Sequence, residues 1–241
     1  MSIHLVGGGW TPDVRPAVYG PFVDEARRLR RNPRVGVIQL YDPTIENGAA
    51  KFEQFADILH ALGVGDVTPL LVAAGDVLAP GLLADLDGLL VAGGPTPQYL
   101  TAVTPIAEEI RTLVSRGVPY LGFSAGAGVA ATRALIGGWK HDDLVIARED
   151  SADGIDQLTV APGLGLVAFA VDAHAAQWGT LTRVVAAVIR GDVDSGVAID
   201  EDTVCIVDAD STRTAGAGQV WWAARVGDTV AIRTTRGDSH H

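Results

Sequence analysis

The strongest constraint on the fold is a regular alternation of short apolar runs with amphipathic stretches through the first 135 residues. Strands that are apolar along their whole length have both faces covered, which is typical of a parallel sheet between two layers of helices. The sequence therefore predicts an α/β fold, a three-layer sandwich with a mostly parallel central sheet and helices on both faces. The expected strands are residues 3–6, 34–41, 67–72, 86–91 and 118–123, and the expected helices are residues 16–30, 49–62, 105–115 and 125–135.

The last third of the chain has a different pattern. Residues 196–199, 203–207, 219–225 and 229–234 predict strands joined by short turns. This arrangement favours an antiparallel extension at one edge of the sheet. The Gly- and Asp-rich residues 137–165 are expected to be mostly loop.

The length of 241 residues suits one α/β domain spanning residues 1–241, and we interpret residues 238–241 (DSHH) as the remnant of a purification tag. Trp221 and Trp222 suggest an interface in a homodimer, although a core strand would explain them equally well.

Composition excludes several classes of protein. A net charge of -11 argues against a broad basic face for nucleic acid or an anionic membrane. The single cysteine, Cys205, excludes a disulfide within the chain and a metal site built on several thiolates. Neither a signal peptide nor an apolar run of membrane-spanning length is recognisable. We therefore expect a cytoplasmic protein with no metal and no organic cofactor.

Residues 122–126 (GFSAG) fit the pattern G-x-S-x-G, after an apolar strand and at the start of an expected helix. In this context the serine lies on a strained turn that lifts its hydroxyl clear of the sheet. The helix N-terminus then offers free N–H groups to an oxyanion, the first being that of Ala125. The pattern predicts Ser124 as a nucleophile. The alternative is a tight Gly/Ala turn in which Ser124 only caps the helix.

Gly93 and Gly94 follow the apolar run 86–91 and allow backbone N–H groups to face a ligand. An oxyanion hole needs such a second donor, so Gly94 is a candidate, and an ordinary turn before Pro95 is the alternative. The glycines at 7–9 lack the spacing of a dinucleotide-binding motif, so they predict no nucleotide.

A serine nucleophile needs a base, usually histidine. His174 follows the apolar run 164–171 and precedes an expected helix from near Gln177, which places it at a strand end. We therefore favour His174 over His141, which lies in the Gly/Asp-rich segment. Glu201 is the candidate orienting acid, because it ends an apolar strand, although three acids in a row are normally a solvated turn.

At these positions the sequence resembles the dipeptidase E and cyanophycinase family of serine peptidases. The fold of that family resembles class I glutamine amidotransferases. The resemblance covers most of the chain, because the similar motifs are well separated and in the family's order. These motifs are 93–100 (GGPTPQYL), 122–127 (GFSAGA), 162–166 (PGLGL) with 171–174 (VDAH), 199–203 (IDEDT) and 216–221 (GAGQVW).

The resemblance implies a triad of Ser124, His174 and Glu201, with an oxyanion hole formed by the backbone of Gly94 and Ala125. Members of the family cleave small peptides beside aspartyl residues or the β-aspartyl–arginine links of cyanophycin. The resemblance therefore implies a small peptide or isopeptide as substrate.

The sequence departs from the family after the histidine. The family carries an aromatic residue and then arginines there, whereas residues 175–180 are AAQWGT and only Arg183 matches a later family arginine. Pro95 also replaces the usual Asn or Asp. Loss of these arginines puts the preference for aspartyl peptides in doubt, and Trp178 would instead offer an aromatic wall. The candidate substrate-binding residues are Thr96, Gln98, Trp178 and Arg183.

Two other functions remain open at this stage. One is an esterase of the α/β-hydrolase class, whose triad runs serine, acid, histidine, with Asp153, Asp156 or Asp172 as the acid. The other is a binding domain that keeps an amidotransferase-like fold without catalysis.

Overall fold

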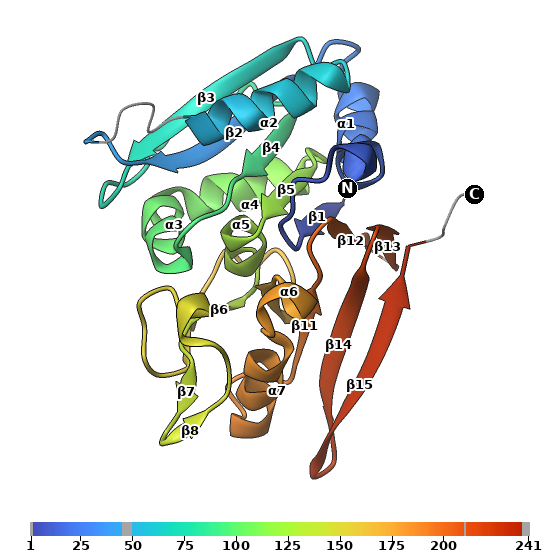
Figure 1. Cartoon of the computed structure of the whole chain (residues 1–241). Helices are drawn as coiled ribbons and strands as arrows, with labels where there is room; N and C mark the ends of the chain where they lie inside the picture. Colours follow the sequence, from blue (N-terminus) through green and yellow to red (C-terminus); the bar gives the residue numbers. More distant parts are fainter. Residues whose placement is uncertain (1, 45–49, 210, 238–241) are drawn as a thin grey trace.

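A computed structural model describes residues 2–44, 50–209 and 211–237; Ala49 of one expected helix and the suspected tag residues 238–241 lie outside these ranges. The largest sheet contains seven strands in the order β13-β12-β1-β5-β4-β2-β3 (Figure 1). Neighbouring strands from β1 to β3 in this order are parallel, while β12 and β13 are antiparallel additions at one edge. The strands are β1 (Ile3–Val6), β2 (Arg34–Tyr41), β3 (Asp66–Ala73), β4 (Gly88–Val91), β5 (Tyr120–Phe123), β12 (Thr203–Val207) and β13 (Thr212–Gly216).

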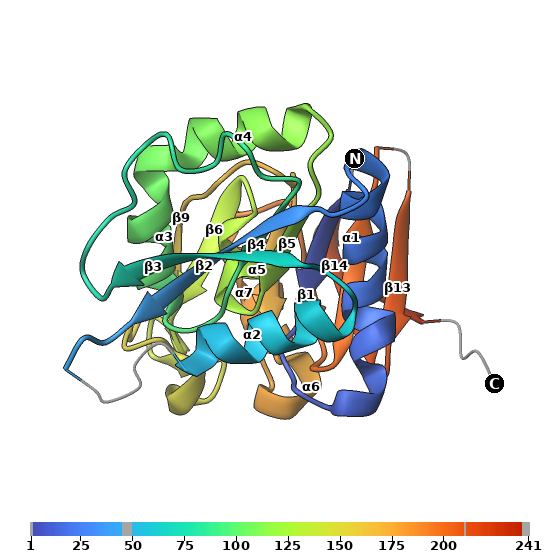
Figure 2. The ribbon, with the colours of Figure 1, turned by 90° about the horizontal axis from the view of Figure 1, so that it is seen from above.

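Helices cover both faces of this sheet, as the apolar strands predicted. The helices α1 and α2 lie on one face and α4 on the other (Figure 2). The helix α1 packs closely on β4 because residue 88 is a glycine: a Cβ added at Gly88 would lie 2.9 Å from the Phe22 ring of α1. The helices are α1 (Arg15–Leu29), α2 (Ala50–Ala61), α3 (Thr96–Val103), α4 (Ala107–Ser115) and α5 (Ala125–Val129). None of the helices in the described ranges is long and apolar enough to cross a membrane.

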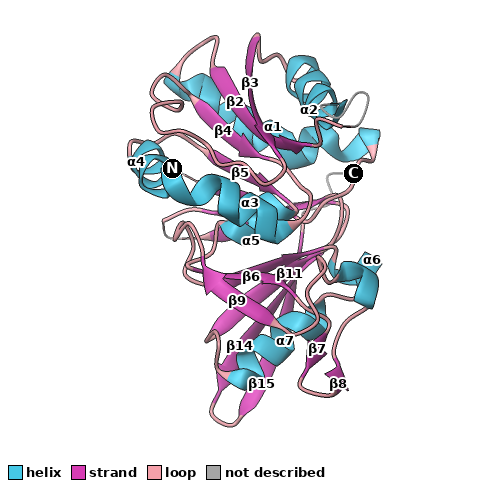
Figure 3. Ribbon diagram, turned by 90° about the vertical axis from the view of Figure 1, so that its left-hand side faces the viewer, coloured by secondary structure: helices cyan, strands magenta, loops and turns pink. Residues whose placement is uncertain are grey.

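The C-terminal strands are divided between two sheets, so only β12 and β13 form the expected antiparallel extension at the edge of the large sheet. β11 and β14 join β10 and β15 in a second sheet, in the order β10-β11-β14-β15, with α7 packed on it (Figure 3). The chain crosses between the sheets at residues 200–202. The additional elements are β10 (Ala170–Ala173), α6 (Ala175–Trp178), α7 (Leu181–Arg190), β11 (Ser195–Ile199), β14 (Gln219–Val226) and β15 (Thr229–Arg236).

The helix expected at 125–135 ends at Val129. Backbone N–H groups of Leu164 and Leu166 donate to the carbonyls of Val129 and Ala130, so the last carbonyls of α5 have hydrogen-bond partners. Residues 164–167 therefore do not belong to the strand that was expected before His174. The chain then leaves the helix to form β6 (Arg133–Gly137), which pairs with β9 (Thr159–Pro162). The following segment is mostly loop, as expected, with the short hairpin of β7 (Lys140–His141) and β8 (Leu144–Val145).

The two tryptophans of β14 are half-buried and have partners within the chain. Trp221 Nε1 donates to Asp200 Oδ1 at 3.0 Å. Trp222 packs edge-on against Phe169. These contacts fit the core-strand interpretation of the pair, and the homodimer stays a prediction.

Candidate active site

Ser124 lies on the sharp turn between β5 and α5, with φ 50° and ψ -106°. Both flanking glycines of G-x-S-x-G are required by close backbone contacts. A Cβ at Gly122 would lie 2.3 Å from the Gly126 carbonyl oxygen, and a Cβ at Gly126 would lie 2.0 Å from the Val91 carbonyl oxygen. The motif therefore encodes a chain that folds back on itself, and the strained residue at its apex carries the hydroxyl.

Neighbouring strands hold this turn in place. The Ser124 N–H donates to the Val6 carbonyl at 2.9 Å, and the Gly126 N–H donates to the Ala92 carbonyl at 3.0 Å. In the described part of the chain, by contrast, the N–H groups of Ala125 and Gly94 have no hydrogen-bond partner. Both residues line the same pocket as Ser124, which makes their N–H groups candidate donors to an oxyanion.

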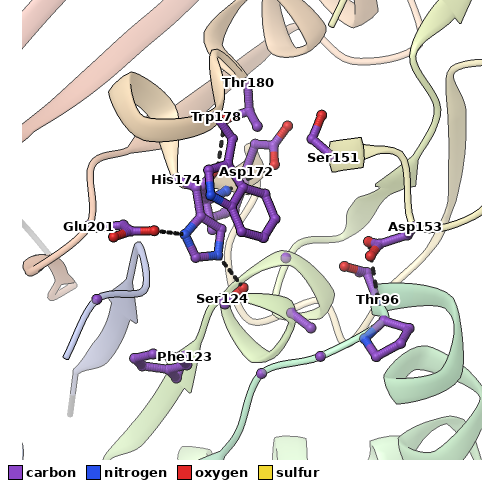
Figure 4. Close-up of a pocket in the computed structure, with 18 of the residues that line it drawn as sticks. Thr96, Phe123, Ser124, Ser151, Asp153, Asp172, His174, Trp178, Thr180 and Glu201 are labelled. Atoms are coloured by element: carbon purple, nitrogen blue, oxygen red, sulfur yellow. Dashed lines mark hydrogen bonds and ion pairs between the residues drawn. The ribbon is translucent and has the colours of Figure 1, made fainter. Parts of the chain in front are cut away.

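His174 reaches the serine from the second sheet. It ends β10 in the left-handed region, with φ 58°, and its N–H donates to the Gly7 carbonyl at 2.9 Å. Its Nε2 lies 2.9 Å from the Ser124 Oγ (Figure 4). His174 lies at a strand end, as expected, but β10 belongs to a different sheet from β5, which carries Ser124.

Gly8 provides the space for the imidazole. A Cβ at this position would lie 2.2 Å from the His174 Cε1, and the φ of +99° disfavours any other residue. Among the glycines that follow β1, Gly8 thus forms part of the wall behind the imidazole.

Glu201 completes the relay on the far side of the ring, where its Oε1 lies 2.7 Å from the His174 Nδ1. The Glu201 N–H donates to the side-chain oxygen of Gln177, which ties the acid to α6. The neighbouring acids have different partners: Asp200 accepts a hydrogen bond from the Ala176 N–H, and Asp202 accepts one from the Thr11 N–H in the loop after β1. The three acids are therefore not a solvated turn, because each carboxylate has its own partner.

Trp178 stacks on the imidazole, with 4.1 Å between ring centroids and 13° between planes. The side chain is 43% exposed, so one face packs on His174 while the rest borders the pocket. Thr180 donates from its Oγ1 to the Ala173 carbonyl and supports the strand end that carries the base.

Replacing Gly8 with alanine is expected to lower kcat by about a hundredfold, because the new methyl group displaces the imidazole from Ser124. The measurement is steady-state hydrolysis alongside thermal unfolding. Gly75→Ala is the matched control, since Gly75 has a similar φ of +92° but open space around its Cβ. Equal effects of the two variants on activity would contradict the role of the wall.

Ser124, His174 and Glu201 all line a pocket of about 630 Å³. Trp10, Phe55 and Phe123 form an aromatic cluster on one side of it, with ring centroids 4.7–5.2 Å apart. In the described part of the chain, no group of three or more His, Cys, Asp or Glu side chains could hold a metal ion.

Residues 50–215 match peptidase family S51, and this range is more than half of the chain. The chain belongs to peptidase family S51. The prediction made from the separated motifs, a member of the dipeptidase E and cyanophycinase family of serine-type peptidases, is confirmed.

Two cyanophycinases, from Synechococcus elongatus and Thermosynechococcus vestitus, are each 31% identical to the chain over 175 residues. The match covers 69% of this chain and 52% of each relative, so the chain spans about half the length of the curated relatives it matches.

Solved structures share the fold. A peptidase from an acI-B1 Actinobacterium superposes with a TM-score of 0.70 at 17% identity, covering 99% of this chain and 95% of the other. A putative peptidase E protein from Listeria monocytogenes EGD-e superposes with a TM-score of 0.54 at 17% identity, covering 90% and 98%. The predicted α/β architecture with a mostly parallel central sheet is therefore confirmed.

The substrate-binding candidates of this S51 chain have different positions. Thr96 starts α3 and lines the pocket, whereas Gln98 is exposed on the same helix and is not among the lining residues. The physical reason is the helix: two residues further along, the side chain has turned by about 200° and faces away. A direct contact of Gln98 with a ligand is thus not supported by its position.

Arg183 is buried and already paired. Its Nε and Nη2 donate to the two carboxylate oxygens of Asp172 at 2.7 and 2.9 Å, and its Nη1 donates to the Ser151 and Gly138 carbonyls. Burial alone would lower the pKa of the guanidinium, but the Asp172 carboxylate outweighs it and raises the pKa. The family arginine therefore ties loop 137–153 to α7, and little of it is free for a substrate.

The other histidine candidate, His141, lies in the β7–β8 hairpin with Asp142 as its nearest acid, and it is not among the residues lining the pocket. Sequence reasoning did not identify Trp10 as a lining residue, and it named Asp153 only as a possible acid of the alternative hydrolase triad. A signal existed only for Asp153, which precedes a glycine in a loop expected near the strand ends.

Proposed function

We propose that this chain hydrolyses the amide bond of a small peptide or isopeptide through an acyl-enzyme formed on Ser124. The Ser124 Oγ attacks the carbonyl carbon while His174 Nε2 takes the hydroxyl proton. Glu201 holds the ring through Nδ1 and stabilises its charged form. The N–H groups of Ala125 and Gly94 bind the oxyanion of the tetrahedral intermediate.

Collapse of that intermediate breaks the C–N bond, and His174 gives the proton to the leaving amine. Water then attacks the acyl-enzyme ester, with His174 as its base, and Ser124 regains its proton as the acid product leaves. No metal or organic cofactor takes part in these steps. The protein atoms needed are the triad and the two free N–H groups.

One observation carries the proposal: the continuous chain Ser124 Oγ–His174–Glu201, with hydrogen bonds of 2.9 and 2.7 Å. An α/β-hydrolase triad is disfavoured, because each candidate acid of that alternative has a different partner. Asp172 pairs with Arg183, Asp156 accepts from Trp139, and Asp153 accepts from Thr96. A binding domain without catalysis is disfavoured as well, since the strained serine and the relay are both complete.

A fluorophosphonate probe tests the proposal, because it reacts with a serine only when a base activates the hydroxyl. We expect stoichiometric labelling of Ser124, located by peptide mass analysis, and at least about a hundredfold slower labelling of His174→Gln. A folded wild-type protein that takes up no label at Ser124 would refute the proposed activity.

A further inference from the structure

The pocket beside the triad has an uneven balance of charge. Two of the acids lining it pair with an arginine: Asp172 with Arg183 and Asp150 with Arg148. Glu201 hydrogen-bonds to His174, which is neutral when it acts as the base. Lys51 and Glu149 are exposed at the rim, where solvent screens them. Asp153 also lines the pocket and, among the described residues, forms no salt bridge with an arginine or lysine, although the charge of Arg183 favours its ionised form.

Asp153 holds its carboxylate at a defined position. The residue is in the left-handed region, with φ 54°, in the loop that Arg183 anchors. Its Oδ2 accepts the Thr96 N–H at 3.3 Å at the start of α3, while Oδ1 has no hydrogen-bond partner among the described residues. The side chain is solvent-accessible and lines the pocket, so a ligand can reach this second oxygen.

The proposed mechanism indicates which portion of the substrate lies beside Asp153. His174 must protonate the leaving amine, so the leaving group lies towards His174 and Trp178. The acyl portion then extends in the opposite direction. In Figure 4, Asp153 and Thr96 lie to the right of Ser124, on the side away from His174 and Glu201.

We propose that Asp153 selects substrates whose acyl portion carries a cationic nitrogen, an ammonium or guanidinium group that binds Oδ1. This inference rests on the proposed function, because it names the substrate class of the same site. The cation belongs either to a free α-amino group or to a basic side chain, and both sources share the charge-assisted hydrogen bond to a carboxylate. An anionic acyl residue is expected to be rejected.

The pKa of Asp153 reflects its surroundings at the pocket wall. Burial raises the pKa of Asp153 from its ordinary value, and the hydrogen bonds from Thr96 and the charge of Arg183 only partly offset this. The charged form is therefore less stable here than in an unfolded chain, so its contribution to stability falls as the pH rises through the range in which Asp153 ionises. A cation bound at Oδ1 would favour the charged form.

The test uses matched p-nitroanilides, whose leaving group is the same throughout. Norleucine p-nitroanilide carries only the α-ammonium, Nα-acetyl-lysine p-nitroanilide only the side-chain ammonium, and Nα-acetyl-norleucine p-nitroanilide neither. Nα-acetyl-aspartate p-nitroanilide is the anionic member. We expect at least one of the two cationic compounds to exceed the neutral one at least about tenfold in kcat/KM, with the anionic compound lowest.

Asp153→Asn keeps the shape and an acceptor for the Thr96 N–H but removes the charge. We expect it to lower kcat/KM for the preferred cationic compound at least about tenfold and to change the neutral one less than about threefold. Glu149→Gln is the matched control, because it removes one acidic charge from the exposed rim of the same pocket. An equal loss with all substrates, or equal effects of the two variants, would overturn the inference.

Binding without turnover separates this inference from the proposed function. In Ser124→Ala, calorimetry with Nα-acetyl-lysinamide, norleucinamide and Nα-acetyl-norleucinamide should show tighter binding of a cationic compound, and adding Asp153→Asn should abolish the difference. Preference in binding with no labelling of Ser124 would refute hydrolysis and keep the role of Asp153. Labelling of Ser124 with no preference for a cation, in binding or in kcat/KM, would refute the role of Asp153 alone.

Discussion

Replacing Ser124 with alanine is expected to lower kcat by at least about a thousandfold while leaving the free energy of unfolding within about 1 kcal/mol of the wild type. The activity falls because no other hydroxyl can form the acyl-enzyme at the apex of this turn. Stability is retained because the turn depends on Gly122, Gly126 and backbone hydrogen bonds, none of which uses the serine side chain. Steady-state hydrolysis and urea denaturation measure the two quantities.

Ser115→Ala is the matched control for that substitution. Ser115 is exposed at the end of α4, and its Oγ donates only to the Thr112 carbonyl. Its variant should hydrolyse substrate at the wild-type rate. Ser124→Ala protein of verified mass that keeps more than a tenth of wild-type kcat would exclude Ser124 as the nucleophile.

The second large effect concerns stability. Asp172→Asn is expected to lower the free energy of unfolding by about 3–5 kcal/mol, because it leaves the buried guanidinium of Arg183 without its counter-charge. Urea denaturation at neutral pH measures the change. Asp66→Asn is the matched control, since the exposed Arg34–Asp66 pair should contribute less than about 1 kcal/mol.

A double variant separates the charge from the shape of that pair. Asp172→Leu with Arg183→Met removes both charges and should recover a large part of the loss, because two apolar side chains need no counter-ions. If Asp172→Asn changed the stability only slightly but raised KM strongly, that result would indicate a substrate-binding role for Arg183.

Local patterns were sufficient for the large sheet. The apolar runs at 3–6 and 34–41 coincide with β1 and β2, because strands covered on both faces must be apolar throughout. The helix expected at 125–135 was wrong after Val129, since Ala-rich sequence favours a helix but the carbonyls at its end bind residues 164 and 166. Only the folded chain brings that distant segment to the end of α5.

The candidate site shows the same division. The glycines around Ser124 are readable because every contact that requires them is made within the turn or with an adjacent strand. The pairing of Arg183 with Asp172 was not predicted, since an arginine that matches a family position does not reveal which acid has already neutralised it. Asp153 was named only as a possible acid of an alternative triad, because its place on the pocket wall depends on how distant segments fold together.

Short-range information thus specified where this chain forms strands and helices, and where it carries a sharp serine turn between two glycines. Which side chains meet at that turn depended on folding, because His174 comes from a second sheet and Glu201 from the crossing between the two sheets. The physical reason is range. Backbone conformation responds to neighbours a few residues away, whereas the two hydrogen bonds of His174 join groups that the sequence separates by 27 and 50 positions.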